Sequence, residues 1–388
     1  MSMGEPTIRL RRWNASITLF ACTAVLLAVP TYSWAKNSNT LPSEPVLVVQ
    51  AGTSSAFYVL WSRTCDRDRH CYAMTRSLDG VHTFSRVSAP PVTFSNDSPG
   101  GNIVDLNFAN ADDGLALTND LRTHKLLLFA TFDGGRSWHR ETSGSGERIY
   151  SLTSTPSSFY AVTDSCTTTT HFCRRFQLDR SPASSLHWTT QSVTPIGGRN
   201  NSNAPSVAAF GHDVWLTTQE QVKPYLSQLA TSYDDGRTFV VTSEPSLNSV
   251  NGCDVTATSS ITLWAQCDEG MMTGYVMYSD DGGSQWTTVE GEPERYVWGS
   301  FDPVSSFDAV SINGDHMNQL ERLNASTRMN ILTGRSPTPG IRQLTFVTTQ
   351  QGVALGQGNG PEQNMTLYET SNAGKSWRVV HLSTRLQI

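Results

Sequence analysis

Residues 131–138 read Thr-Phe-Asp-Gly-Gly-Arg-Ser-Trp, and four other segments of the chain are built in the same way. Each follows, with small departures, the pattern Ser/Thr-x-Asp-x-Gly-x-polar-aromatic. The other copies are residues 77–84, 232–239, 279–286 and 370–377. We call these five segments the box turns. A pattern that recurs along the chain predicts an architecture of repeated units before any single residue is considered.

The box turns have the chemistry of a hairpin turn between two strands. Apolar, β-prone runs such as residues 126–130 and 275–278 precede them. Asp and Ser side chains hydrogen-bond to the backbone of turns, and Gly adopts a positive φ easily. The closing aromatic ring is suited to burial between neighbouring sheets. We therefore assign a structural role to Asp79, Asp133, Asp234, Asp281, Asn372, Trp138, Trp286 and Trp377.

The spacing of the box turns predicts seven repeats. Their third residues are 79, 133, 234, 281 and 372, so two intervals are about 50 residues and two are about 100. We place one degenerate repeat in each long interval, around residues 177–180 with Trp188 and around residues 329–333. About 50 residues is the length of a four-stranded propeller blade. The sequence predicts an all-β, seven-bladed β-propeller of four-stranded antiparallel blades, with six blades as the alternative.

The box turns resemble the Asp-box, or BNR repeat, of sialidases, sortilin-type receptors, xyloglucan-cleaving glycosidases and propellers of the photosystem II assembly-factor type. Residues 102–108 and 113–117, followed by the second box turn, are similar to one full repeat of the assembly-factor type. Residues 341–346 and 352–356, followed by the last box turn, are similar to another. The resemblance covers residues 42–388. It implies a propeller and says little about activity.

The first 35 residues have the features of an export signal. Three arginines within residues 9–12 precede the apolar residues 17–29, and residues 33–35 form a small-x-small cleavage pattern. The apolar stretch is too short to span a bilayer comfortably. We expect cleavage near Ala35, a linker over residues 36–44 and the propeller over residues 45–388. The mature protein is predicted to be secreted or to reside in the cell envelope, and the style of the signal suggests a bacterial host.

Six of the seven cysteines follow the predicted signal, in three pairs that are close in sequence. An even number of cysteines in an exported chain predicts disulfides. None of the three spacings is Cys-x-x-Cys, so we predict no metal site, and no motif calls for a cofactor. The predicted pairs are Cys65–Cys71, Cys166–Cys173 and Cys253–Cys267.

The balance of acidic and basic residues argues against some classes of binding partner. The chain has 28 basic and 34 acidic residues, a net charge of −6 at pH 7. No run of basic residues follows the predicted signal, which argues against nucleic acid or an anionic lipid surface as the partner. We expect a protein or glycan partner, no membrane span in the mature protein, and a monomer, since no coiled-coil pattern is visible.

The first strand of each blade in a propeller lines the central channel. We align these strands as residues 46–51, 103–108, 149–154, 205–210, 252–257, 306–311 and 341–346. Their alternation of apolar and polar residues places the polar residues on the channel side. Three carboxylates, Asp105, Asp254 and Asp308, are thereby candidates for catalysis or ligand binding. The alternative is a water-filled channel in which the protein itself satisfies these side chains.

Loops at one face of the predicted propeller form a second candidate site. Residues 197–201 connect blades 3 and 4, and the aromatic-rich residues 295–301 connect blades 5 and 6. Aromatic rings beside Arg and Asn suit stacking on a sugar or gripping a peptide. The alternative is that these aromatic residues pack the loop onto the core. The candidate ligand-binding residues are Arg199, Asn200, Arg295, Tyr296 and Trp298.

The resemblance includes enzymes, and sialidases are the clearest comparison. The sialidase marker, an Arg-Ile/Leu-Pro motif before the first box, does not occur after the predicted signal, and sialidases have six blades rather than seven. We therefore expect a non-catalytic propeller that binds a protein, peptide or cell-envelope glycan. The first alternative is a glycoside hydrolase, sialidase-like or using Asp105 with Asp254 or Asp308 as an inverting carboxylate pair. The second is an assembly or chaperone factor.

Overall fold

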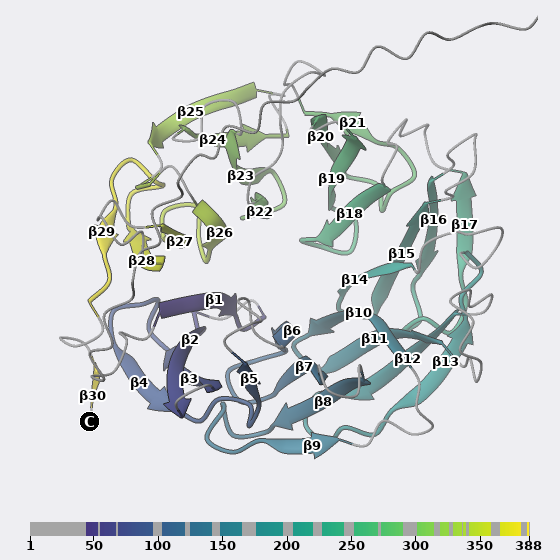
Figure 1. The fold of residues 1–388 in the computed structure, drawn as a ribbon. Coiled ribbons are helices and arrows are strands. Elements are labelled where there is room, and N and C mark those ends of the chain that lie inside the picture. The colour runs from purple at the N-terminus through teal and green to yellow at the C-terminus, as the bar shows by residue number, and fades with distance from the viewer. Residues whose placement is uncertain are drawn as a thin grey trace, which may run out of the picture. The chain divides into compact units, whose positions relative to one another are not determined.

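The computed structural model describes residues 44–388 except 53–54, 67–68, 96–102, 121–124, 142–147, 165–175, 197–204, 220–226, 244–251, 271–272, 290–300, 314–318, 326–328, 336, 339–340, 358–364, 382–385 and 388. The described residues form strands, turns and bends and contain no helix. The strands make seven sheets arranged as a β-propeller (Figure 1). The predicted all-β class and the number of blades are confirmed. The predicted signal and residues 36–43 of the predicted linker lie outside the described residues.

Each blade is a continuous piece of chain whose strands pair antiparallel in chain order, from the channel outward. Blade 1 contains β1 (Glu44–Gln50), β2 (Phe57–Asp66), β3 (Arg69–Ser77) and β4 (Phe84–Val87), with β5 (Thr93–Ser95) paired to β3. Blade 2 contains β6 (Ile103–Phe108), β7 (Gly114–Asp120), β8 (Lys125–Thr131) and β9 (His139–Glu141). Blade 3 contains β10 (Arg148–Thr155), β11 (Ser158–Asp164), β12 (Phe176–Pro182) and β13 (Thr189–Val193). Blade 4 contains β14 (Ser206–Phe210), β15 (Asp213–Gln219), β16 (Ser227–Ser232) and β17 (Val240–Ser243).

The last three blades follow the same order. Blade 5 contains β18 (Gly252–Ala257), β19 (Leu263–Gly270), β20 (Thr273–Ser279) and β21 (Thr287–Thr288). Blade 6 contains β22 (Phe301–Pro303), β23 (Asp308–Asn313), β24 (Gln319–Asn324) and β25 (Met329–Arg335). Blade 7 contains β26 (Ile341–Phe346), β27 (Gly352–Gln357), β28 (Met365–Thr370) and β29 (Arg378–Val379).

The second strand of each blade is the most deeply buried. All seven residues of β11 are buried, and in blades 4 and 5 the same strand carries Trp215 and Trp264, both with 0% relative exposure. Neighbouring blades cover both faces of this strand. The sequence of the second strand is therefore a nearly continuous apolar run and does not alternate between apolar and polar residues.

The ring closes between blades 7 and 1. The first strand, β1, packs against β26, β27 and β28 of blade 7. The last strand, β30 (Leu386–Gln387), pairs parallel to the outer strand β4, with Leu386 opposite Phe84. Each blade is complete without a strand from the opposite end of the chain, so β30 is an addition at the rim of blade 1.

The box turns connect the third and fourth strands of blades 1, 2, 4, 5 and 7, away from the channel as the sequence predicts. In blade 2, the Thr131 hydroxyl donates to Asp133 and accepts the N–H of Gly135 at 2.8 Å. Asp133 in turn accepts the N–H of Ser137 at 2.9 Å and the hydroxyl of Ser137 at 2.7 Å. The carboxylate therefore organises the turn by itself and needs no metal or ligand.

Asn372 shows which part of this network is essential. Its Oδ1 accepts the N–H of Ser376 at 2.9 Å, as an Asp does, while its Nδ2 donates to the Ser376 hydroxyl at 2.8 Å. The hydroxyl simply reverses its role because it both donates and accepts. The backbone hydrogen bond is thus the common element, and it explains why Asn is accepted at the Asp position.

The fifth residue of four box turns is a glycine that contacts the preceding blade. Gly236 has φ +83°, and a Cβ there would lie 2.1 Å from Leu178 of blade 3. Gly374 has φ +81°, and a Cβ there would lie 2.0 Å from Leu320 of blade 6. In these turns glycine therefore suits both the backbone conformation and the close approach of the preceding blade, whereas the first box turn has Val81 at this position with φ +75°.

The closing aromatics pack in the same interfaces. Phe84 is buried in a cluster with residues of blade 7, and Trp138, Trp286 and Trp377 are half-buried against clusters that include the preceding blade. The indole N–H of Trp138 also donates to the carbonyl of Ser88 at 2.8 Å. The predicted structural role of these box residues is consistent with every one of these contacts.

The degenerate repeat predicted in blade 3 is shifted relative to the alignment. Asp179 lies within β12, and the turn in the box frame is residues 181–188, with Ala183 at the Asp position. Ser181 is fully buried and Trp188 is half-buried, so the first and last residues of the pattern persist. In blade 6, the predicted residues 329–333, which carry no box in the sequence, belong to the outer strand β25.

One predicted disulfide is present. Cys253 and Cys267 lie directly opposite each other on β18 and β19, with an S–S distance of 2.10 Å. Cys71 is also disulfide-bonded, while the side chain of Cys65 lies outside the described part of the structure. Cys166 and Cys173 fall within residues 165–175, which are not described, so their pairing stays a prediction.

Replacing Gly236 with Ala tests the contact between a box turn and the preceding blade. We expect Gly236→Ala to lower the free energy of unfolding by about 2–4 kcal/mol, from backbone strain and overpacking against Leu178 together. Gly211→Ala is the matched control, because Gly211 also has a positive φ, +61°, but has no atom within 4 Å of the added Cβ. Urea denaturation of both variants measures the difference, and equal losses would contradict the packing argument.

Candidate functional site

The first strands of the blades bring polar and apolar side chains together around the channel. Six of the seven aligned inner strands are observed close to their predicted bounds, as β1, β6, β10, β14, β18 and β26. Along β26, Leu344 is buried, whereas Gln343 and Thr345 on either side are half-buried. This alternation is the pattern expected for a strand with one packed side and one wetter side.

A cavity of about 330 Å³ lies among the inner strands of blades 7, 1 and 2. Its walls are mostly aliphatic, and its polar groups come from one carboxylate, two glutamines and one threonine. The lining residues are Val46, Leu47, Val48, Val49, Gln50, Tyr72, Ile103, Asp105, Leu106, Gln343 and Thr345. A concave, largely apolar pocket with a few polar groups is the usual form of a ligand site.

Gln343 holds one wall of the cavity in place. Its side-chain Oε1 accepts the N–H of Val48 at 2.8 Å, and its Nε2 donates to the carbonyl of the same residue. The amide thus pairs with β1 as a neighbouring strand would and links blade 7 to blade 1. Since Gln343 uses both ends of its amide in this way, its role is to shape the cavity.

Asp105 is the only carboxylate among the described residues that line the cavity. It is half-buried on β6, and burial raises its pKa to about 6, opposed by a hydrogen bond from the N–H of Leu106. No other described side chain forms a hydrogen bond or ion pair with it. Asp105 therefore retains acceptor capacity that faces the cavity.

Asp254 is the second predicted carboxylate, on the inner strand β18 of blade 5. It is exposed, and desolvation by the surrounding protein still raises its pKa, opposed by a hydrogen bond with Ser206 of blade 4. Asp105 belongs to blade 2 and does not share a cavity with Asp254 in the described structure. The described lining of the cavity that contains Asp105 therefore includes no second carboxylate.

The predicted position of Asp308 is wrong. The inner strand of blade 6 is β22, and Asp308 lies on the second strand, β23. Its carboxylate forms an ion pair with Arg322 at 2.9 Å and accepts a hydrogen bond from Asn324 at 2.9 Å. Burial acts to raise its pKa, but these bonds outweigh burial and lower it. The alignment failed because β22 is only three residues long and contains a proline, so it has no readable alternation.

Asp302 on β22 is the carboxylate that the alignment missed. The residue as a whole is half-buried, but its carboxyl group is enclosed by protein, which raises its pKa to about 7. It accepts the backbone N–H of Phe346 and so links blade 6 to blade 7. Ser151 makes a similar link, since its hydroxyl accepts the N–H of Val207 at 3.0 Å. Several polar residues of the inner strands therefore join neighbouring blades.

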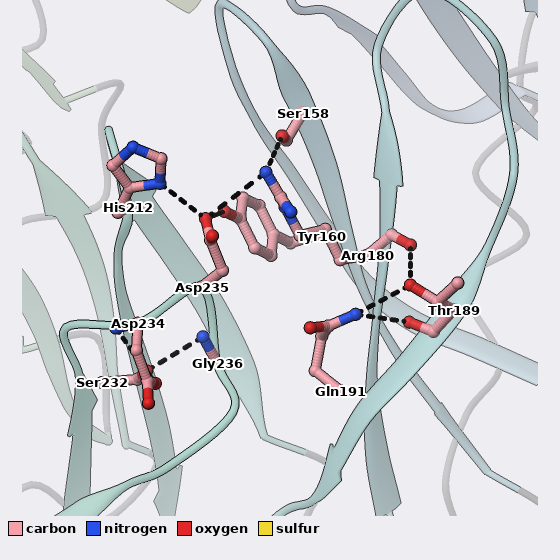
Figure 2. Close-up of polar contacts among 10 residues, drawn as sticks. All are labelled: Ser158, Tyr160, Arg180, Thr189, Gln191, His212, Ser232, Asp234, Asp235 and Gly236. Carbon is pink, nitrogen blue, oxygen red and sulfur yellow. Dashed lines mark hydrogen bonds and ion pairs between the residues drawn. The ribbon is translucent and has the colours of Figure 1, made fainter.

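A second polar cluster lies at the junction of blades 3 and 4, away from the cavity (Figure 2). Asp235 of the blade 4 box turn accepts the hydroxyl of Tyr160 at 2.9 Å and contacts His212 at 3.0 Å and Arg180 at 3.5 Å. Burial acts to raise the pKa of Asp235, but hydrogen bonds from His212 and Tyr160 outweigh it and lower the pKa. Arg180 also donates to Ser158 at 2.9 Å.

This cluster repeats elsewhere in a simpler form, which points to a structural role. The position of Tyr160 in its blade is held by Tyr58, Trp215 and Trp264 in blades 1, 4 and 5. Each of these rings donates a hydrogen bond to a backbone carbonyl of the next blade, namely that of Ala111, Gly282 or Ser305. The Tyr160–Asp235 hydrogen bond therefore joins successive blades in the same way, except that its acceptor is a side-chain carboxylate instead of a backbone carbonyl.

The predicted loop residues cannot be placed in this site. Arg199, Asn200, Arg295, Tyr296 and Trp298 all lie within residues 197–204 and 290–300, outside the described residues. Within the described part of the chain, no group of three or more His, Cys, Asp or Glu side chains is arranged to hold a metal ion. No helix there has the length and hydropathy that crossing a membrane requires.

No protein-family model and no curated protein sequence matches the chain. A crystal structure of puromycin hydrolase matches with a TM-score of 0.58 at 14% identity, over 87% of this chain and 53% of that chain. The β-propeller domain of the Trilobed protease from Pyrococcus furiosus matches with a TM-score of 0.57 at 8% identity, over 87% and 98%. YCF48 bound to D1 peptide matches with a TM-score of 0.48 at 13% identity, over 72% and 82%.

These matches show the β-propeller fold and nothing finer. The chain spans about half the length of the puromycin hydrolase chain that it matches. The box repeat itself is not part of what these matches show, so the resemblance to Asp-box propellers stays a prediction. The function of this chain must therefore be argued from its own residues.

Replacing Asp302 with Asn tests the enclosed carboxylate at the junction of blades 6 and 7. The pKa of Asp302 in the folded protein, about 7, exceeds that of an unfolded Asp, about 3.9. Its contribution to stability is therefore fully present below pH 4 and is lost as the pH rises through 7. We expect wild-type thermal stability to fall between pH 5 and pH 8, and Asp302→Asn to fall less.

Asp308→Asn is the matched contrast for this experiment. The pKa of Asp308 is lowered in the folded protein, so its contribution is present above pH 4 and is lost as the pH falls through the lowered value. This variant is expected to be less stable than wild type at pH 7, while Asp302→Asn is more stable. Thermal melts from pH 5 to pH 8 that showed parallel curves for wild type and Asp302→Asn would contradict the assignment.

Proposed function

We propose that the chain is an exported, non-catalytic propeller of the Asp-box type that binds a segment of a peptide or protein in the cavity between blades 7, 1 and 2. The observation that carries this proposal is the cavity itself, with aliphatic walls and one carboxylate among its described lining residues. Such a lining is suited to recognising a ligand, and its described residues include no second carboxylate to pair with Asp105 in acid–base chemistry.

The composition of the walls favours a peptide over a glycan. Sugar sites present the open face of an aromatic ring for stacking. The one aromatic residue at this cavity, Tyr72, has a relative exposure of 6% and belongs to the core between blades 1 and 2. The valine, leucine and isoleucine side chains of the walls instead match the aliphatic part of an amino-acid side chain.

Two features support the Asp-box membership and the exported location. The hydrogen bonds of the box turns give the carboxylate a purely structural role in the turn, as expected for that repeat. The Cys253–Cys267 disulfide is a bond that persists in oxidising compartments. An assembly or chaperone role is the more specific form of the same proposal, in which the bound segment belongs to an unassembled protein.

Obstructing the cavity tests the proposed function. The full chain would be screened at pH 7.5 against a library of hexapeptides, and retained peptides would be measured by calorimetry. Val46 is 38% exposed at the cavity, so Val46→Trp is expected to place an indole there and to weaken binding at least tenfold. Val240→Trp is the matched control, because Val240 is 62% exposed on the outer strand β17.

Three outcomes decide the proposal. Loss of binding in Val46→Trp with unchanged binding in Val240→Trp supports it. Equal binding by both variants would place the site elsewhere, and retention of no peptide by the wild-type chain would also contradict it. Turnover of a sialyl or plant-polysaccharide substrate that disappears in Asp105→Asn would instead favour the hydrolase alternative.

A further inference from the structure

We infer that the group bound in the cavity between blades 7, 1 and 2 is a basic side chain, a lysine or arginine of the peptide ligand, with Asp105 as its counter-charge. This inference rests on the proposed function and specifies the chemistry of the ligand. It follows from the position of one carboxylate within aliphatic walls and from the engagement of the neighbouring polar groups.

The first step is the state of the polar groups at the cavity. Gln343 uses both its oxygen and its nitrogen on the backbone of Val48, so it offers little to a ligand. Asp105 accepts the N–H of Leu106 and bonds to no other described side chain. A carboxylate has room for about four hydrogen bonds, so Asp105 is the strongest acceptor that the cavity presents.

The second step is the cost of covering this carboxylate. Asp105 is already desolvated by its surroundings, as its raised pKa shows. A neutral ligand would remove the remaining water, so at pH 7.5 Asp105 would have either to stay charged without a partner or to take up a proton, and both cost free energy. A cation restores a partner in the same low-dielectric setting, and its hydrogen bonds to the carboxylate are charge-assisted. The cavity therefore discriminates against neutral groups and against anions.

The third step is shape. Lysine and arginine combine a charged end with three or four methylene groups, which pack on apolar surface. The cavity walls are formed by β1 and β6 with Val46, Val48 and Leu106, and Asp105 lies among them. A basic side chain thus places its stem on the aliphatic walls and its charge on Asp105. The negative net charge of the chain, −6, also attracts a basic peptide.

Four charged residues lie on the elements packed around Asp105. They are Glu44 at the start of β1, Asp120 at the end of β7, Arg148 at the start of β10 and Arg342 in β26. Arg342 is exposed, and no described charged side chain contributes to the pKa of Asp105, which burial and the Leu106 N–H determine. Relative to the described side chains, a bound cation would therefore add a charge that this group does not already have beside it.

The experiment compares pools of hexapeptides that share one fixed residue: Lys, Arg, Gln, Met or Glu. The wild-type chain is expected to retain the Lys and Arg pools at least tenfold better than the other three at pH 7.5. Because Asp105 must be ionised to pair with the cation, retention at pH 5 is expected to fall about tenfold. In Asp105→Asn the preference for Lys and Arg should disappear.

Asp254→Asn is the matched control, since it removes a channel carboxylate of blade 5 that does not line the cavity, and it should keep the preference. Thermal melts confirm that each variant is folded, and Asp105→Ala provides a second test of the same group. Equal retention of all five pools, or an unchanged preference in Asp105→Asn and Asp105→Ala, would overturn the inference while the proposed function stands. If the wild-type chain retains no pool, the proposed function itself fails.

Discussion

The structure depends on the box turn. In this turn a carboxylate or amide oxygen accepts a backbone N–H of the same turn, while a glycine packs closely against the preceding blade. The Asp133 oxygen accepts the N–H of Ser137, and Gly135 at φ +80° leaves room for Met74 of blade 1. The first interaction shapes the link between the third and fourth strands. The second sets how closely two blades approach. In the blades that carry it, a single octapeptide therefore shapes both the outer hairpin and its packing on the preceding blade.

Side chains supply a second set of links nearer the channel. Tyr58, Tyr160, Trp215 and Trp264 each donate a hydrogen bond from the second strand of one blade to the next blade. On the inner strands, Gln343, Ser151 and Asp302 accept backbone N–H groups of a neighbouring blade. A buried polar group is costly unless it is bonded, so these contacts both satisfy the groups and align the blades. Asp105, by contrast, is a polar group of an inner strand that lines a cavity and has no described side-chain partner in the next blade.

The sequence predicted much of the fold because the determinants are local. The box pattern lies within eight residues, and the alternation along β6 and β26 is visible in five or six. Two predictions were wrong at places where the local sequence pattern is incomplete. In blade 3 the aspartate of the pattern is replaced by Ala183, so the nearest aspartate, Asp179, was aligned instead. In blade 6 the inner strand is reduced to Phe301–Pro303, and the next alternating segment, which contains Asp308, took its place in the alignment.

The amino-acid sequence alone thus determines the repeat, the all-β class and, through the spacing of the repeats, the predicted number of blades. The repeat can be recognised because its hydrogen bonds and backbone angles lie within a short stretch of chain. The sequence alone does not determine the cavity. Gln343 and Val48 are 295 positions apart, and Asp105 belongs to a third blade. Whether a given aspartate is paired, as Asp308 is with Arg322 of the neighbouring strand, or faces a cavity, as Asp105 does, depends on which side chains the folded chain places beside it. Burial and charge pairing are properties of that assembled neighbourhood, so the cavity forms only when the ring closes.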